Sequence, residues 1–373
     1  MRQVLKVSVL CVMVVCIVAT FSLIGCKTAA SETTAASETT AAAETTAAAE
    51  TTAAAETTAA EKKWKFAYII PNFEANWYNR IVEGFQMGAK EVGADVMVLP
   101  SESNVDKEVA NIDLAIAQKV DGIGMFSFNE TGAPLAVKKG AEAGIPVVSC
   151  DSVGEATTKG YDNVANVDFN WTQMGEIYAQ WMADNYPGED FVIIAGALSH
   201  LPVIKVNASM KSTSEKLGKN KLLDIRGTDY DSTKAAAAME DLLNSGLKFK
   251  IVFVMMEEMA SAVCRVLAEK GVLNNPYVVI SQNGQPLGLD LIKNGDMQFT
   301  ISTSPGWEGY VAFREMWSYV NGKNKDKSRQ MWLPLMPVDK KVLELNDKTK
   351  VVPWDMDPIF LDLTKQYYPE LMW

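Results

Sequence analysis

The chain has 373 residues, with 46 Asp and Glu against 35 Lys and Arg, which gives a formal net charge of −11 at pH 7. This acidic balance disfavours a nucleic-acid partner, because nucleic-acid binding requires a basic face. The cysteines do not form a disulfide framework: Cys11 and Cys16 lie in an apolar N-terminal run, and only Cys150 and Cys264 lie in the folded part. We expect those two to be buried small hydrophobic side chains rather than a bridge or a nucleophile.

The N-terminus has the pattern of an export signal. Arg2 and Lys6 precede a mostly apolar run at residues 7–24, which fits a signal peptide or a membrane-spanning helix. The sequence Leu23-Ile24-Gly25-Cys26 resembles the bacterial lipobox, whose cysteine is lipidated and becomes the first residue of the mature protein. We therefore predict a signal peptide at residues 1–25 and a lipid on Cys26, which would anchor the protein at the outer face of the cytoplasmic membrane.

Residues 26–61 begin with this cysteine and continue as a low-complexity segment rich in Ala, Thr and Glu. Its glutamates recur at every sixth position from Glu32 to Glu56. On a helix each step of that size rotates the side chain by about 240°, so no continuous apolar face is available for packing. We expect a disordered stalk, with a weak Ala-driven helix as the alternative.

The folded part begins with a β-α unit at residues 65–93. Residues 66–70 are an apolar run that ends at Pro71, as expected for a strand buried on both faces. A helical period follows from Tyr78 and ends at Gly93, with apolar residues at Ile81, Phe85, Ala89 and Val92. In open parallel sheets ligands lie just beyond the carboxyl ends of strands. The connecting loop contains polar and aromatic residues typical of a site for small polyhydroxy molecules: Asn72, Phe73, Asn76, Trp77 and, at its edge, Tyr78. The alternative is a solvated turn whose aromatic residues fold into the core.

Strand and helix patterns alternate along the rest of the chain. In the first half, strands are predicted at 94–99, 122–126 and 145–150, and helices at 106–119 and 133–143. Beyond Asn170 the order restarts, with helices predicted at 172–185, 206–217, 233–244 and 259–270 and strands at 190–195, 222–226, 251–255 and 277–281. The segment 250–281 repeats the layout of 120–149. The sequence therefore predicts an α/β protein of two similar domains, each with a mostly parallel, doubly wound sheet.

The sequence lacks the parts of a catalytic or metal site. It contains one histidine, His200 in GALSHLP, and no HExxH, paired CxxC, GxSxG or Walker motif. We expect no enzyme activity, no cofactor and no metal. His200 follows a strand pattern and could contact a ligand, but a surface-loop histidine is the favoured interpretation.

The chain resembles the ribose- and galactose-type periplasmic binding proteins in the order and spacing of five segments: FAYIIPNFEANWYNRIVEGFQMGAKEVGADVMVLPSESN, DGIGMFS, AVKKGAEAGIPVVSCDS, VFVMMEEMASAV and GDMQFTIS. The resemblance extends from Phe66 to about Val342. It implies the type I fold, in which two Rossmann-like lobes are joined by a three-strand hinge and the ligand lies between them. The implied lobes are residues 62–167 plus 304–335, and residues 168–303 plus 336–373 with the tail. The implied crossings lie near 166–168, 303–305 and 333–336, and we expect the tail beyond Val342 to form a strap across a lobe.

The resemblance also implies a ligand site. Trp77, Tyr78 and Tyr230 match aromatic residues that stack on the sugar, and Asp151 matches the acid after the fourth strand. The implied ligand-binding set is Asn72, Asn76, Trp77, Tyr78, Asp151, Tyr230, Asn283 and Thr303.

Several positions depart from the family pattern. An arginine often follows the acid, where this chain has Ser152, and Lys205 is the only base near the second-lobe arginine position. Met256 stands at the position of an Asn, Asn283 replaces an acid, and Thr303 replaces a Gln or Asn. The exact ligand is therefore not implied.

The resemblance implies a monomeric, lipid-anchored, extracytoplasmic solute-binding protein that delivers a monosaccharide or related polyol to an ABC transporter permease. An alternative keeps the fold but makes the protein a sensor that signals to a membrane kinase or chemoreceptor. A nucleoside or an autoinducer is the alternative ligand.

Overall fold

The computed structural model describes residues 62–127, 132–151, 161, 163–323 and 329–372. All of the elements below belong to one compact unit, Ala60–Trp373. The predicted signal peptide, Cys26 and the stalk lie outside the described residues. Within the described part, none of the helices is both long and apolar enough to span a membrane.

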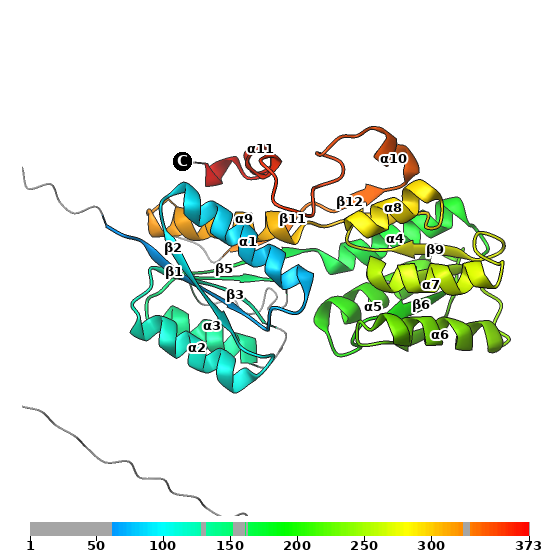
Figure 1. The fold of residues 1–373 in the computed structure, drawn as a ribbon, viewed down its shortest axis with the longest axis horizontal. Coiled ribbons are helices and arrows are strands. Elements are labelled where there is room, and N and C mark those ends of the chain that lie inside the picture. Colours follow the sequence, from blue (N-terminus) through cyan, green and yellow to red (C-terminus); the bar gives the residue numbers. More distant parts are fainter. Residues whose placement is uncertain (1–61, 128–131, 152–160, 162, 324–328, 373) are drawn as a thin grey trace, which may run out of the picture. The chain divides into compact units, whose positions relative to one another are not determined.

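The first sheet of the described chain has six strands in the order β11-β5-β4-β3-β1-β2, and every neighbouring pair is parallel (Figure 1). The strands are β1 (Lys65–Ile70), β2 (Asp95–Pro100), β3 (Gly122–Phe126), β4 (Val147–Cys150), β5 (Val164–Phe169) and β11 (Arg329–Leu333). One face is covered by α1 (Asn76–Glu91) and α9 (Pro305–Val320), and the other by α2 (Val105–Ala117) and α3 (Gly132–Glu142).

Strand β1 is apolar throughout because both of its faces are covered. Phe66, Tyr68 and Ile70 enter the hydrophobic cluster beneath α1 and α9, whereas Ala67 and Ile69 enter the cluster beneath α2 and α3. Successive strand side chains point to opposite faces, so a strand between two helical layers needs an apolar residue at every position.

Helices α1 and α9 approach each other closely at glycines. A Cβ on Gly84 would lie 1.9 Å from the Gly306 carbonyl oxygen, and one on Gly309 would lie 1.9 Å from the Ile81 carbonyl oxygen. Both distances are far inside van der Waals contact. The glycines therefore join an early and a late segment of the chain into one layer.

The second sheet has four parallel strands in the order β7-β6-β8-β9. They are β6 (Phe191–Ala195), β7 (Leu222–Gly227), β8 (Ile251–Val254) and β9 (Val278–Ser281). The helices that alternate with them are α4 (Trp171–Asn185), α5 (Leu201–Leu217), α6 (Ser232–Asn244), α7 (Glu257–Glu269) and α8 (Pro286–Asn294). The predicted α/β class with parallel sheets is confirmed.

The chain passes between the two sheets at three places. Strand β5 leads into α4, and β10 (Thr300–Ser302) leads into α9. Strand β11 leads into β12 (Met336–Val338), which pairs with β10 in an antiparallel ribbon.

Two elements differ from the sequence-based predictions. Residues 164–169 form strand β5, although Asn166 and Asp168 interrupt its apolar pattern; both side chains are fully buried and polar. Helix α5 begins at Leu201 rather than at 206, because His200 is its N-cap residue and Pro202 occupies its first turn.

The tail contains α10 (Lys340–Glu344), α11 (Ile359–Tyr367) and a final turn at Pro369–Leu371. The Trp307 indole donates a hydrogen bond to Thr364 Oγ1 at 3.0 Å, and Arg314 Nε donates to the Leu371 carbonyl at 3.4 Å. The end of the tail therefore packs on α9, which lies on the first sheet, whereas we had grouped the whole tail with the second lobe.

Candidate functional site

A cavity of 660 Å³ lies where the carboxyl ends of strands from both sheets meet. Its first side is formed by residues at or just beyond the ends of β1 to β5, and its second side by those that follow β6, β7, β8 and β9. The residues from the predicted ligand-binding set that line it are Asn72, Asn76, Trp77, Tyr78, Asp151, Tyr230 and Asn283. They come from segments far apart in sequence, so the fold brings them to one place.

Thr303 is the member of the predicted set that does not line the cavity. It is 1% exposed, and its backbone N–H donates to the Asn283 carbonyl at 2.9 Å. Thr303 is therefore placed to hold the Asn283 backbone.

Aromatic rings form much of the wall. Trp77 lies 5.6 Å from Trp354 and 6.2 Å from Phe169 between ring centroids, and Tyr78 lies 4.9 Å from Phe126. Phe126 and Trp171 also line the cavity, and the sequence interpretation did not include them. Phe126 is the last residue of β3 and Trp171 lies two residues beyond β5. Their position at strand ends is the available signal, because ligands in open parallel sheets lie at the carboxyl ends of strands.

His200 contradicts the prediction of a surface-loop histidine. It lines the cavity, is 9% exposed, and its Nδ1 lies 2.6 Å from the Tyr230 hydroxyl. Burial lowers the pKa of His200 to about 4, so the imidazole is neutral near pH 7. The prediction failed because it placed the start of α5 too late and left His200 in a loop.

The backbone is strained around the cavity. Six lining residues other than glycine have positive φ angles: Ser103, Asp151, Asp229, Tyr230, Met256 and Asn283. Such conformations are uncommon outside glycine and cost of order 1–3 kcal/mol for residues that do not favour them. Strain of this kind is concentrated at functional sites, which supports a binding role for the cavity.

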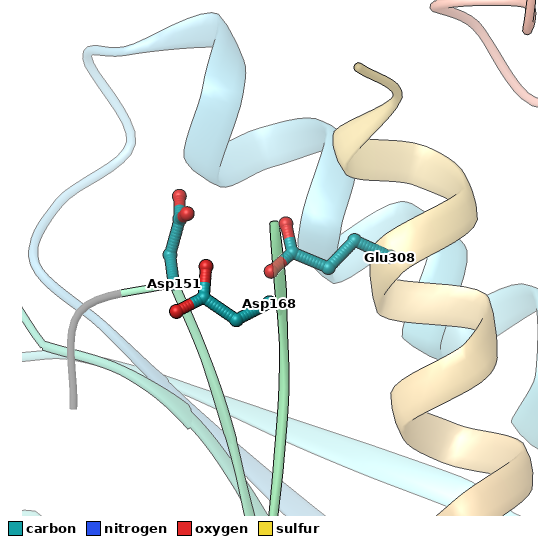
Figure 2. Close-up of side chains that lie close together, drawn as sticks. All are labelled: Asp151, Asp168 and Glu308. Atoms are coloured by element: carbon teal, nitrogen blue, oxygen red, sulfur yellow. The ribbon is translucent and has the colours of Figure 1, made fainter. Parts of the chain in front are cut away.

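Behind the cavity lies a cluster of three buried carboxyl groups, which we call the acid triad: Asp151, Asp168 and Glu308 (Figure 2). Carboxylate oxygens of the three lie within 4.8 Å of one another. Asp151 follows β4, Asp168 belongs to β5 and Glu308 belongs to α9, and their exposed fractions are 3%, 0% and 0%. Of the three, Asp151 lines the cavity.

Burial dominates the electrostatics of the acid triad. It raises the pKa of Asp151 to about 7, partly offset by the Trp77 indole and by Asp168. The pKa values of Asp168 and Glu308 are raised well above the usual range, first by burial and then by the negative charges of their neighbours. Asp168 Oδ1 accepts hydrogen bonds from the Phe169 backbone N–H at 2.7 Å and from the Trp171 indole at 2.9 Å. These donors favour the ionised form of Asp168.

The architecture and the site together define a class of protein. Two α/β units, each with a parallel sheet, share a polar and aromatic cavity at the carboxyl ends of their strands. The chain crosses between the units three times, as in proteins that enclose a small solute. The chain belongs to the periplasmic binding protein family: the family model, described as a periplasmic binding protein domain, matches residues 66–324.

Curated relatives agree with this assignment. The chain is 26% identical to the ribose import binding protein RbsB of Salmonella typhimurium over 243 residues, which cover 64% of this chain and 79% of that protein. It is 22% identical to the RbsB of Bacillus subtilis over 274 residues, which cover 72% of this chain and 85% of that protein.

Solved structures share the fold. An ABC transporter solute-binding protein from Bacillus halodurans with bound myo-inositol superposes with a TM-score of 0.68 at 20% identity, covering 76% of this chain and 97% of that chain. One from Burkholderia graminis in complex with D-arabinose has a TM-score of 0.68 at 21% identity, with the same coverage of 76% and 97%. The predicted type I periplasmic binding protein fold is confirmed. These relatives are solute-binding proteins and not enzymes, in agreement with the prediction of no enzymatic activity.

Proposed function

We propose that the protein captures a monosaccharide or related polyol outside the cell and delivers it to the permease of an ABC importer. The observation that supports this most is the cavity itself, where polar and aromatic side chains from the ends of both sheets converge. The names of the relatives, which describe import binding proteins and sugar-bound solute receptors, point to the same role.

The lining suits a polyhydroxy ring. Sugar rings have apolar C–H faces, which Trp77, Tyr78 and Tyr230 would cover, and hydroxyl groups, which Asp151 and Asn283 would bind. Thr303 would act indirectly by holding Asn283. None of these roles requires a bond in the ligand to break.

The proposed lobes are residues 62–167 plus 304–335, and residues 168–303 plus 336–358, with the end of the tail docked on α9. A ligand that contacts both sides of the cavity would favour a closed arrangement of the lobes about the three crossings. Residues 1–25 would direct export, and a lipid on Cys26 would hold a monomeric receptor at the outer face of the cytoplasmic membrane. A stalk at residues 27–61 would tether the lobes near the permease.

The test begins with a thermal-shift screen of the protein against sugars, polyols and nucleosides, because selective binding raises the melting temperature by mass action. Hits are then titrated by calorimetry and recovered for mass spectrometry. A bound sugar or polyol that returns chemically unchanged is the expected result. Turnover of the ligand, or the absence of any hit among sugars and polyols, would contradict the proposal.

Small-angle scattering tests the closure. The radius of gyration should fall at saturating ligand if the lobes swing together. The matched variants are Trp77→Ala, which removes a cavity wall, and Phe73→Ala, which removes a ring that is 54% exposed in the same loop and does not line the cavity. The first should need about tenfold more ligand or more for both binding and compaction, and the second should behave like wild type.

A further inference from the structure

The charged side chains of the cavity have one sign. Among the lining residues that the structure describes, the charged ones are Glu74, Asp151, Asp229 and Glu258, and none is Lys or Arg. His200 adds no positive charge near pH 7, because burial lowers its pKa to about 4. A ligand that enters this cavity therefore meets acidic side chains and no Lys or Arg on the described wall, although Asp229 is ion-paired with Lys234 outside the lining.

Carboxyl oxygens without hydrogen-bond partners gather at the cavity wall and behind it. Within the described chain, Asp151 Oδ1, Asp168 Oδ2 and both carboxylate oxygens of Glu308 are buried without a hydrogen-bond partner. The Trp77 indole lies near enough to Asp151 to lower its pKa in part, but its own N–H forms no hydrogen bond of normal geometry. Groups of this kind cost free energy unless a donor or a positive charge reaches them.

One base acts on the acid triad from a distance. The charge of Lys205 lowers the pKa of Asp168, but Lys205 is half-buried on α5 and does not line the cavity. Asp168 also has two N–H donors, whereas Asp151, the member that lines the cavity, has an unpartnered oxygen. Asp151 is therefore the member of the acid triad that combines an unpartnered oxygen with a place in the cavity lining.

Aromatic rings surround this position. The pKa of the Tyr78 hydroxyl is raised first by burial and then by the Asp151 charge, and that of Tyr230 by burial, by Tyr78 and then by Asp151. Both hydroxyls therefore lie within electrostatic range of the Asp151 carboxyl group. Trp77 and Trp171 line the same cavity. Tyr and Trp faces attract cations, so the rings and the carboxyl group favour the same kind of ligand group.

We propose that the ligand carries a positively charged amine, which lies against Asp151, with Asp168 and Glu308 behind it and aromatic rings around it. The inference rests on the solute-binding function proposed above and narrows its substrate class to amino sugars and amino polyols. A neutral sugar could donate hydroxyl hydrogens to Asp151 but would supply no positive charge to a cluster of carboxyl groups whose ionised forms burial disfavours. An ammonium group supplies both the donors and the opposite charge.

The experiment compares ligands that differ only in this group. Glucosamine, galactosamine and mannosamine are titrated by calorimetry at pH 6.5, each beside its parent sugar and its N-acetyl derivative. An amino sugar should bind at least about tenfold more tightly than both neutral partners, which corresponds to about one unit in log Kd. Preference for a neutral partner, or equal affinity, overturns the inference while leaving the solute-binding function intact. If nothing binds in this panel or in the sugar and polyol screen, the proposed function fails as well.

Variants locate the effect. Asp151→Asn should reduce the preference for the amine to less than about threefold, and Asn tolerates the left-handed backbone at this position, where φ is 66°. Glu308→Gln should reduce the preference less, since it removes a carboxyl group that the ligand does not touch. The matched control is Glu108→Gln, another buried acid that does not line the cavity. It should keep the full preference.

The same variants separate an amine site from a metal site. Three buried carboxylates within 4.8 Å could also surround a divalent ion, so thermal shifts are measured with Ca²⁺ and Mg²⁺ alone. If either ion stabilises the wild type, fails to stabilise Glu308→Gln, and the amino sugars show no preference, the acid triad is a metal site and the inference is wrong. An unchanged amine preference in a folded Asp151→Asn protein would also overturn it.

Discussion

Replacing Asp151 by Asn should change how the stability of the protein depends on pH. Burial raises the pKa of Asp151 from 3.8 to about 7 in the folded state. A carboxyl group whose folded pKa is raised contributes its full stability below its unfolded pKa, and that stability is lost as the pH rises through the folded pKa. Asn does not titrate, so the variant should escape this loss.

The magnitude follows from the size of the shift. The difference between 3.8 and about 7 spans about 3 pH units, and each unit corresponds to about 1.4 kcal/mol. The free energy of unfolding of Asp151→Asn should therefore rise relative to wild type by about 4 kcal/mol between pH 4 and pH 7 and then level off.

Urea unfolding of ligand-free protein at half-unit steps from pH 4.5 to pH 8 measures this difference. Buried acids such as Glu108 and Glu257, with pKa values raised by burial to about 7 and about 8, titrate in both proteins and cancel in the comparison. Asp95→Asn, in an exposed ion pair with Lys63, is the control and should run parallel to wild type. Parallel curves for Asp151→Asn would refute the electrostatic account of the acid triad.

Three further outcomes are expected. Gly309→Ala should lower the free energy of unfolding by about 3 kcal/mol in urea titrations. The reason is that its Cβ would lie 1.9 Å from the Ile81 carbonyl oxygen and would force α1 and α9 apart. A variant as stable as wild type would show that the two helices do not pack this way. Trp77→Ala should weaken calorimetric binding of every accepted ligand by about tenfold or more, whereas Phe73→Ala should not, and a loss confined to one ligand would argue against a general ring wall. Cys26→Ala should release the protein from membranes or leave it uncleaved, and lipid labelling that finds no acyl group on the wild type would exclude the anchor.

The pattern of the sequence was sufficient for the α/β class. Strands such as β1 and β3 are short apolar runs and helices such as α1 have a clear period, and both signals depend on residues close together in the chain. The loop after β1 was assigned to the site on the same basis, because the position of ligands in open parallel sheets follows from strand direction. Asp151 and Tyr230 came from the resemblance to a family rather than from periodicity.

The tertiary structure decided which buried residues, from β5 and α9, surround the expected site residues. Strand β5 escaped prediction because Asn166 and Asp168 interrupt its apolar pattern, and these polar side chains are buried only because other layers cover them. Glu308 had no local signal at all, since α9 reaches Asp151 through the close packing of its glycines on α1.

Local periodicity determines which segments become strands and helices, because it reflects which face of each segment avoids water. It carries no information on which distant segments meet. The acid triad joins residues from β4, β5 and α9, and its electrostatics arise from burial by layers that assemble only in the folded chain. The sequence by itself therefore determined the architecture and the carboxyl edge of the sheets, where a ligand would bind. The protonation of the acid triad, and with it the ligand group that we propose, depended on tertiary burial.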